Sequence, residues 1–248
     1  MNNESKGNSK KVVWYLVTFT TALCTMIYEL ILAQTLSSVM GNTAFRYSLT
    51  IGLYIAAMGL GAILVDKFSK KDNDLHYFVQ VELYLAILGA VAPWIVLVAD
   101  SVLQGLSAQG TINYFSTVPQ LFSNVINHGI IILIGFLAGL ELPLLMRIGK
   151  KQNIDSSFKV LSMDYVGTTA GAILFPLVLF PNFNLFTMAY IFSLINTITA
   201  FSIARNFKSR GSYKIMAFIW TLFLIFLISH SDTLNQSLVN YFYVRGTP

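Results

Sequence analysis

The chain has 248 residues, of which 55% are hydrophobic and 11% are charged, and its net charge is +5. A soluble domain usually carries roughly 25% charged residues, so this composition excludes a soluble globular protein. The positive charge does not indicate nucleic-acid binding, because the basic residues flank apolar segments, where they set membrane orientation. The sequence therefore predicts an all-α integral membrane protein that contacts the lipid bilayer and has no nucleic-acid partner.

Seven apolar segments follow one another, most of them close to the roughly 20 residues that cross a hydrocarbon core. They cover residues 12–34, 47–65, 77–98, 122–146, 161–180, 185–204 and 215–229. The first is predicted to be a retained span, because it is longer than a signal-peptide core and no small-residue cleavage site follows it. Pro93, Pro143 and Pro176 are expected to bend or unwind their spans, since proline lacks the amide donor that a helix needs.

Basic residues alternate between the loops that join these segments. Three precede the first span, three follow the second, four follow the fourth and four follow the sixth, whereas only Arg46 and Arg245 fall elsewhere. Cytoplasmic loops carry an excess of Lys and Arg. The pattern predicts a multi-pass protein of the plasma (inner) membrane with a cytoplasmic N-terminus.

The expected organisation has three parts. Residues 1–11 form a cytoplasmic tail, residues 12–230 a transmembrane helical domain of about seven helices, and residues 231–248 an external C-terminal tail. Residues 100–120 contain no basic residue but include glycines and a proline, so they are predicted to form an external loop that can include a short interfacial helix.

A weak internal similarity predicts two inverted three-helix repeats followed by one further helix. Residues 29–30 match 141–142, and residues 61–64 match 171–174, at offsets of 112 and 110. Each unit holds an odd number of spans, so the second copy would run inverted, as in many transporter folds. Chance is the alternative, because Gly, Ala, Ile and Leu are abundant in all membrane helices.

Acidic residues inside the spans are the candidate functional groups. An acidic side chain at the centre of a span costs roughly 2.5–3.5 kcal/mol on insertion scales and usually faces the bundle interior. Glu29, Glu82, Glu141 and Asp164 are of this kind. Glu82 and Asp164 lie about one turn from the cytoplasmic boundary, where snorkelling to water could explain them, whereas Glu29 and Glu141 lie deeper.

No basic residue lies at a matching depth along the sequence. Arg46 could approach Glu29 from outside, and Arg147 could approach Asp164 at the cytoplasmic face. Two interpretations of the carboxyl groups follow: they meet a cation, a proton or a ligand amine, or they are protonated or hydrogen-bonded groups that tie helices together.

Other polar and small residues favour packing roles. His128, with Asn124 and Asn127 nearby, has no second His or Cys beside it, so a metal site is not expected. The patterns Gly135-x-x-x-Gly139 and Gly167-x-x-x-Gly171 allow helices to approach closely, most simply within the subunit. The sequence contains no P-loop, HExxH or GxSxG motif, and no catalytic residue is predicted.

Three blocks of the chain resemble a known family. They are YELILAQTLSSVMGNTAFRYSLTIGLYIAAMGLGAIL (28–64), GFLAGLELPLLMRI (135–148) and MDYVGTTAGAILFPLVLFP (163–181). In this order they are similar to the N-terminal membrane domain of bacterial membrane-bound spermidine synthase-like proteins, the polyamine aminopropyltransferase family. The positions that match within the blocks form the predicted ligand-binding set: Tyr28, Glu29, Glu141, Asp164 and Tyr165.

The resemblance also implies partners and a cofactor. In that family a soluble domain follows the membrane domain, binds decarboxylated S-adenosylmethionine and holds the diamine acceptor. The catalytic domain is expected to be missing from this chain, so no cofactor is assigned to it. The expected partners are a separate soluble aminopropyltransferase and polyamines.

Three functions follow from these observations. The leading hypothesis is a membrane module of a polyamine-synthase-like system that anchors or serves the synthase and binds polyamine through its intramembrane carboxylates. The alternatives are a secondary transporter for a small molecule and a purely structural membrane anchor. An enzyme that acts alone is the least favoured, because the catalytic motifs are absent.

Overall fold

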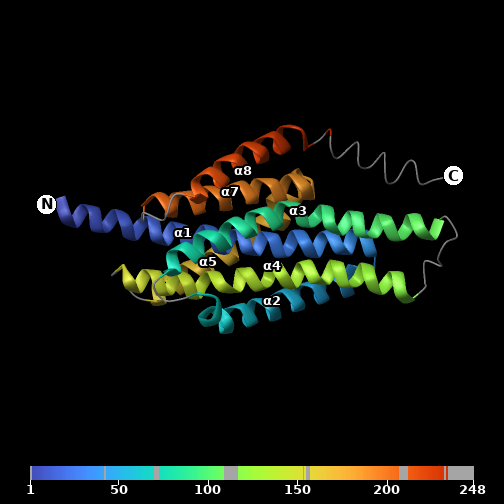
Figure 1. Cartoon of the computed structure of the whole chain (residues 1–248), viewed down its shortest axis with the longest axis horizontal. Helices are drawn as coiled ribbons and strands as arrows, with labels where there is room; N and C mark the ends of the chain where they lie inside the picture. Colours follow the sequence, from blue (N-terminus) through green and yellow to red (C-terminus); the bar gives the residue numbers. More distant parts are fainter. Residues whose placement is uncertain are drawn as a thin grey trace.

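The computed structural model describes residues 2–41, 43–69, 73–108, 117–152, 154, 157–206, 212–231 and 233. Its regular elements in these ranges are all helices, which confirms the predicted all-α class. They are α1 (Asn2–Met40), α2 (Thr43–Phe68), α3 (Asp74–Ala108), α4 (Thr117–Lys151), α5 (Ser157–Leu174), the π-helix η2 (Phe175–Leu179), α6 (Phe180–Asn182), α7 (Leu185–Asn206) and α8 (Ser212–Ser229). Figure 1 shows them as an elongated bundle.

Six of the predicted spans are long apolar helices in the structure. The segments Lys11–Met40, Thr43–Phe68, Asp74–Leu103, Leu121–Lys151, Ser157–Asn182 and Leu185–Arg205 are long and apolar enough to cross a membrane. The seventh predicted span corresponds to the shorter apolar helix Ile215–Ser229, and its crossing stays a prediction. Of the predicted C-terminal tail, only Ser231 and Thr233 lie within the described residues.

Helices extend past several of the predicted segment boundaries. Helix α3 continues to Ala108 and α4 begins at Thr117, so much of the predicted loop 100–120 is helical, and residues 109–116 lie outside the described residues. Helix α1 begins at Asn2, so the described part of the predicted N-terminal tail is helical, and its cytoplasmic location stays a prediction.

The three prolines behave differently from one another. Pro176 lies in η2, where the chain changes from α to π geometry, as expected for a residue that removes one backbone donor. Pro93 and Pro143 lie inside α3 and α4, which remain α-helical on both sides. A long helix packed against neighbours tolerates one lost hydrogen bond.

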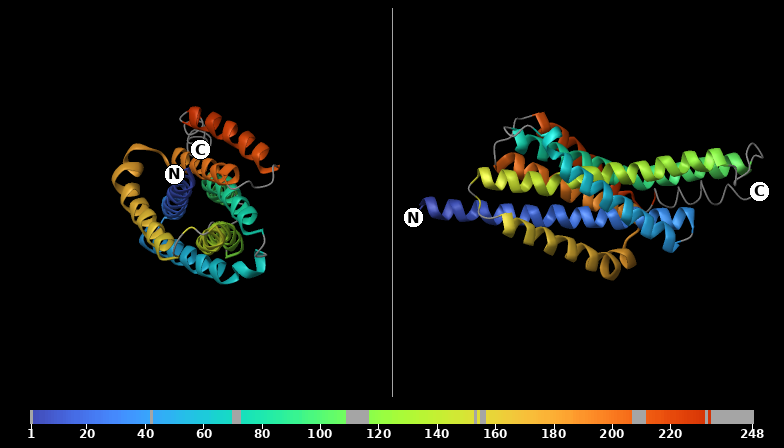
Figure 2. Two further views of the ribbon diagram at one scale, coloured as in Figure 1. Left: turned by 90° about the vertical axis from the view of Figure 1, so that its left-hand side faces the viewer. Right: turned by 90° about the horizontal axis from the view of Figure 1, so that it is seen from below.

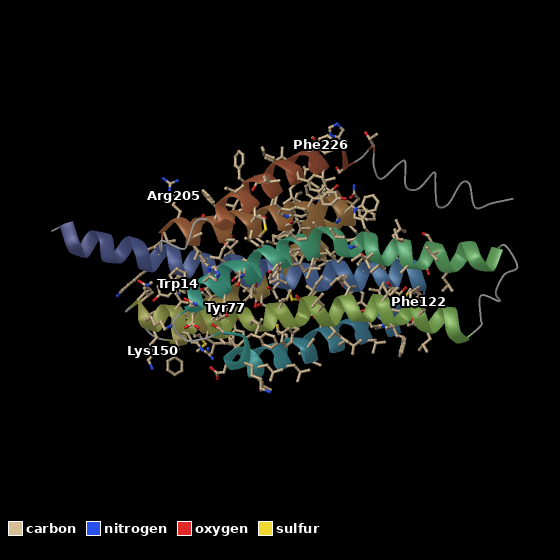
Figure 3. The ribbon with its side chains drawn as sticks, in the orientation of Figure 1. Trp14, Tyr77, Phe122, Lys150, Arg205 and Phe226 are labelled. Carbon is tan, nitrogen blue, oxygen red and sulfur yellow. The ribbon has the colours of Figure 1, made fainter. Side chains whose placement is uncertain are left out.

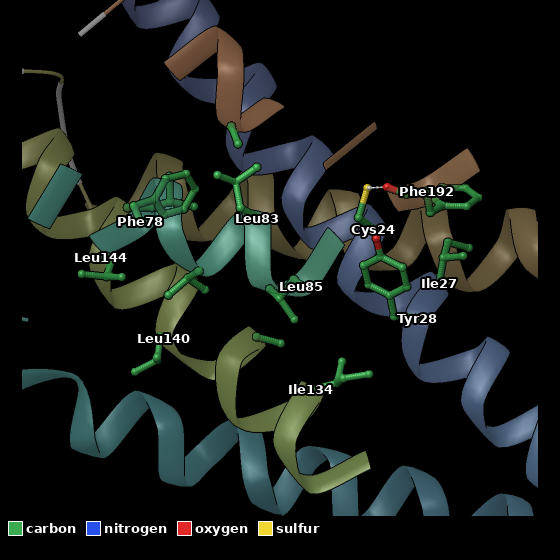
Figure 4. Packing of buried hydrophobic residues seen from close by; sticks show 14 of the residues in the cluster. Cys24, Ile27, Tyr28, Phe78, Leu83, Leu85, Ile134, Leu140, Leu144 and Phe192 are labelled. Atoms are coloured by element: carbon green, nitrogen blue, oxygen red, sulfur yellow. Dashed lines mark hydrogen bonds between the residues drawn. The ribbon is translucent and has the colours of Figure 1, made fainter. Parts of the chain in front are cut away.

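Helix α1 lies at the centre of the bundle. It packs against α2, α3, α4, α5 and α7, while α2 packs mainly on α4, α5 on α1, and α3 on α7 (Figure 2). Its buried residues include Trp14, Cys24 and Ile27, and Figure 4 shows Cys24 directed at the backbone oxygen of Phe192 on α7. The central helix α1 therefore contacts both members of two helix pairs, α2 with α4 and α3 with α7.

The outer helices carry large apolar side chains on their free faces. Ile63 of α2, Leu177 of η2 and Phe218 of α8 are 75%, 70% and 64% exposed. Exposed apolar surface of this extent would be unfavourable in water but matches a hydrocarbon environment. Trp14, Lys150 and Arg205 lie towards one end of the bundle, here called the basic end, and Phe122 lies towards the other (Figure 3).

Glycines allow close backbone contacts between two pairs of helices, α2 with α4 and α5 with α1. A Cβ atom on Gly139 of α4 would lie 1.9 Å from the backbone oxygen of Met58 on α2, and one on Gly167 of α5 would lie 2.3 Å from the backbone oxygen of Phe19 on α1. Only glycine permits such an approach. The two GxxxG patterns therefore pack helices within the subunit, and each brings an outer helix, α2 or α5, against an inner one.

Candidate functional site: an acidic cavity between four helices

A cavity of about 390 Å³ lies between α1, α2, α4 and α5. Its walls combine apolar or small side chains with the acidic residues Glu29, Glu141 and Asp164. Three of the five predicted ligand residues, far apart in the sequence, thus meet at one site. No lysine, arginine or histidine is among its lining residues.

Helical spacing explains why these residues share a cavity. On α1, Ala22, Thr25 and Glu29 line it, and their separations of three and four residues place them on one face. Asp164 and Thr168 of α5 also line it, four residues apart. The glycine contacts of α2 with α4 and of α5 with α1 then close the walls.

Glu141 is the best-defined acidic group in the cavity. The hydroxyl of Thr25 donates a hydrogen bond of 2.7 Å to its Oε2, and the hydroxyl of Tyr54 donates one of 3.3 Å to the backbone oxygen of Thr25. Glu141 is 4% exposed, and its Oε1 has no hydrogen-bond partner among the described residues. A buried carboxyl oxygen without a donor is unfavourable, so the carboxyl group of Glu141 is only partly satisfied by the chain.

Glu82 of α3 lies behind Glu141, away from the cavity. It is completely buried, and its carboxyl group interacts directly with that of Glu141. No hydroxyl, amide or basic side chain in the described residues donates to either of its carboxyl oxygens. The expectation that Glu82 snorkels to water was wrong, because it lies eight residues into α3, roughly 12 Å from the helix start.

The arginines considered as partners for the cavity contact other groups. Arg46 donates a hydrogen bond of 3.2 Å to Asn124 on α4, not to Glu29. Arg147 forms an ion pair with Asp66 and lies 4.0 Å from a carboxyl oxygen of Asp74, not near Asp164. Lys151 also pairs with Asp74, at 2.8 Å. Arg147 and Lys151 join α2, α3 and α4 at the basic end.

The two predicted tyrosines lie off the cavity. The ring of Tyr28 faces α3, where a Cβ on Gly89 would lie 2.4 Å from it, and Figure 4 shows Tyr28 beside Cys24 in the buried core. Tyr165 is 63% exposed on the outside of α5. Neither tyrosine is among the residues that line the cavity.

The polar residues of α4 form local contacts. The amide of Asn127 donates to Ser123, and a ring nitrogen of His128 lies 2.6 Å from the backbone oxygen of Asn124. Within the described ranges, no group of three or more His, Cys, Asp or Glu side chains is arranged to hold a metal ion. These residues link one turn of α4 to the next.

Six long apolar helices and a lipid-compatible surface fit an α-helical membrane protein, and this one has an acidic cavity between its helices. No family model matches the chain, and no solved structure matches it.

Curated relatives give a more specific relationship. The chain is 33% identical over 184 residues to a polyamine aminopropyltransferase of Leptospira interrogans. The aligned region covers 73% of this chain and 33% of the relative. It is 32% identical to polyamine aminopropyltransferase 2 of Ralstonia nicotianae, over 79% of this chain and 35% of the relative. A polyamine aminopropyltransferase of Oceanobacillus iheyensis is 28% identical over 84% of the chain and 38% of its own length.

These matches support a relationship to the polyamine aminopropyltransferase family. The chain spans about a third of the length of the curated relatives it matches.

Proposed function

We propose that this chain is the membrane module of a polyamine aminopropyltransferase-like system and that its acidic cavity binds a polyamine. The observation that carries the proposal is the cavity itself, in which Glu29, Glu141 and Asp164 line an apolar space without a basic residue. Carboxylates buried without a partner are costly, and a ligand cation offsets that cost. The similarity to polyamine aminopropyltransferases supports a polyamine as that cation.

The acidic residues of the cavity are spread along the helix axes, as the ammonium groups of a polyamine are spread along its chain. Asp164 lies three residues before Gly167, which contacts Phe19 of α1, so Asp164 is about one turn below the level of Phe19. Glu29 lies ten residues beyond Phe19 on α1, roughly 15 Å further along the axis. A chain of methylenes with ammonium groups at intervals can contact several carboxylates at once, with the methylenes against apolar side chains such as Met58.

We assign the transfer reaction and its cofactor to a different domain or subunit. Decarboxylated S-adenosylmethionine would bind to an aminopropyltransferase domain or to a separate soluble subunit, and this module would anchor that catalyst and hold polyamine beside it. The loop charges support a cytoplasmic N-terminus in the plasma membrane. A separate soluble catalyst would bind on that side, where it finds its cofactor, whereas a domain joined to the predicted external C-terminus would not.

Binding to the purified protein tests the proposal. Spermidine or putrescine should bind the unmodified chain, and Glu29→Gln and Glu141→Gln should each lower the affinity about tenfold, the loss of one partly buried ionic contact. Asp66→Asn is the matched control, because it removes the same charge outside the cavity. Absence of binding to the unmodified protein, or equal affinity in all variants, would contradict a polyamine site and leave only the anchoring role.

We also propose that α1–α3 and the set α4, α5 and α7 are inverted repeats. In these repeats α1 corresponds to α4, and α2 corresponds to α5. The contact of α2 with α4 is then equivalent to the contact of α5 with α1, and both contacts are extensive. The glycine contacts follow the same register: Gly61 meets Phe136 and Gly139 of α4, and Gly171 meets Leu23 and Met26 of α1. Glu29 and Glu141 then occupy equivalent places.

An experimental structure would test the repeat by superposition. The set α1–α3 should superpose on α4, α5 and α7 after a two-fold rotation about an axis in the membrane plane. Failure to superpose would remove the repeat. Uptake of labelled spermidine into proteoliposomes would in turn favour transport over static binding.

A further inference from the structure

The pair formed by Glu82 and Glu141 is a second feature of the acidic site, on the side away from the cavity. Glu141 lines the cavity, whereas Glu82 does not and is completely buried. The two carboxyl groups interact directly, across the contact between α3 and α4. A ligand in the cavity can therefore act on Glu82 only through Glu141.

The groups that surround this pair bring no positive charge. The carboxyl group of Glu82 interacts electrostatically with Cys24 and Tyr28 of α1 and with Glu141 of α4. Helix α7 packs along α3, where Ser193 donates a hydrogen bond to the backbone oxygen of Ala86. One turn further along both helices lie Glu82 and Asn196, and the amide of Asn196 is buried with no hydrogen-bond partner in the described residues.

The groups around Glu141 are likewise neutral or acidic. Thr25 of α1 donates a hydrogen bond to it, Tyr54 of α2 lies near it, and Asp164 of α5 adds a further carboxyl group. Two carboxylates in contact inside a low-dielectric interior cannot both be ionised without a cation. One proton held between them removes the repulsion and forms a hydrogen bond from one carboxyl group to the other.

We propose that Glu82 and Glu141 share one proton while the cavity is empty, and that cation binding at Glu141 expels it, so that the site exchanges a proton for a polyamine. An ammonium N–H of the ligand donates to the carboxylate of Glu141 from the cavity and replaces the shared proton as the source of positive charge. The proton leaves through the cavity to water, and both carboxyl groups are then ionised beside the ammonium. No bond other than O–H is broken.

This exchange rests on the proposed polyamine binding and adds a regulation of that site by pH. If one proton is released for each ligand bound, the affinity rises about tenfold for each unit of pH through the range where the pair holds its proton. Glu82→Gln keeps a hydrogen-bond donor beside Glu141 but has no proton to release. Its binding should therefore lose most of this pH dependence.

Calorimetric titration of the purified full chain with spermidine measures the exchange directly. Repeating the titration near neutral pH in buffers of different ionisation enthalpy gives the number of protons released, for which we expect about one in the unmodified protein and about none in Glu82→Gln. Asp66→Asn, outside the cavity, should release the same number as the unmodified protein. Binding without proton release, or equal release in Glu82→Gln, would overturn the exchange and leave polyamine binding intact.

Infrared spectroscopy without any ligand tests the shared proton separately. In a detergent free of ester groups, the carbonyl stretch of a protonated carboxyl group should be present in the unmodified protein and weaker in Glu82→Gln. Spermidine should reduce this band in the unmodified protein only. Absence of the band overturns the shared proton, whereas absence of spermidine binding overturns the proposed function and the exchange together.

Discussion

The protein holds its acidic residues in two contrasting environments. At the basic end, Asp66 and Asp74 pair with Arg147 and Lys151, and Ser69 donates a further hydrogen bond of 2.7 Å to Asp74. In the cavity, Glu29, Glu141 and Asp164 have no basic residue beside them in the wall. Carboxyl groups of the same chemistry are thus neutralised by the chain in one place and left without a cation in the other.

This difference distinguishes an acidic residue that stabilises the fold from acidic residues that we propose bind a ligand. Asp74 is buried with its cations supplied by α4, so its role is complete without a ligand: it fixes the start of α3 against the end of α4. The cavity carboxylates are also costly to bury, and no basic residue in the wall offsets that cost. We infer that their cation comes from outside the chain. Four substitutions test this difference between the two environments.

A lysine introduced into the cavity should pair with its carboxylates, as Arg147 and Lys151 pair with acidic residues at the basic end. Met58 lines the cavity, and Met58→Lys offers a cation of similar length to the carboxylates around it. Spermidine binding should fall more than tenfold, a loss of at least about 1.4 kcal/mol, because the ligand must displace an internal ion pair. Met58→Gln, of similar length without the charge, should keep its affinity within about threefold, and an equal loss in both variants would indicate a steric effect instead.

Removing the charge of Asp74 should destabilise the fold. The side chain of Asp74 is 1% exposed and contacts Lys151 and Ser69, and hydrogen bonds to a charged group are worth about 1.5–3 kcal/mol each. Asp74→Asn should therefore lower the free energy of unfolding by about 2 kcal/mol, measured by denaturation in detergent. Spermidine affinity should be unchanged; a change would mean that the basic end is coupled to the cavity.

The equivalent change at Glu82 should have the opposite sign. Glu82→Gln replaces a buried acid that has no cation with a neutral donor to Glu141, and neutralising an uncompensated buried charge is often stabilising. We expect the free energy of unfolding to rise by about 1 kcal/mol in the same assay. The gain should grow as the pH rises, because the unmodified pair loses its shared proton and with it that part of its stability. A destabilisation at every pH would show that Glu82 has a structural partner.

The smallest effect is expected at Asp66. Its side chain is 72% exposed although it pairs with Arg147, and exposed ion pairs contribute roughly 0–1 kcal/mol. Asp66→Asn should lower the free energy of unfolding by less than about 0.5 kcal/mol, and added salt should abolish the difference. A loss as large as that of Asp74→Asn would show that Arg147 cannot hold Asp74 without Asp66.

Part of the site was accessible from the sequence, and part was not. Acidic residues at membrane depth singled out Glu29, Glu141 and Asp164, which line the cavity. Tyr28 and Tyr165 were predicted because they match the family blocks beside Glu29 and Asp164, yet adjacent residues on a helix point about 100° apart. That rotation turns Tyr28 towards α3 and Tyr165 outwards.

The sequence by itself determined the helical class, six long apolar helices and the presence of uncompensated carboxyl groups inside them, because length, hydropathy and charge act locally along the chain. The tertiary structure decided which of those groups meet. Glycines at positions 139 and 167 bring α2 onto α4 and α5 onto α1, and this packing closes the cavity. The burial of Glu82 against Glu141 depends on how α3 and α4 rotate about their axes, which is set by side-chain fit between distant segments.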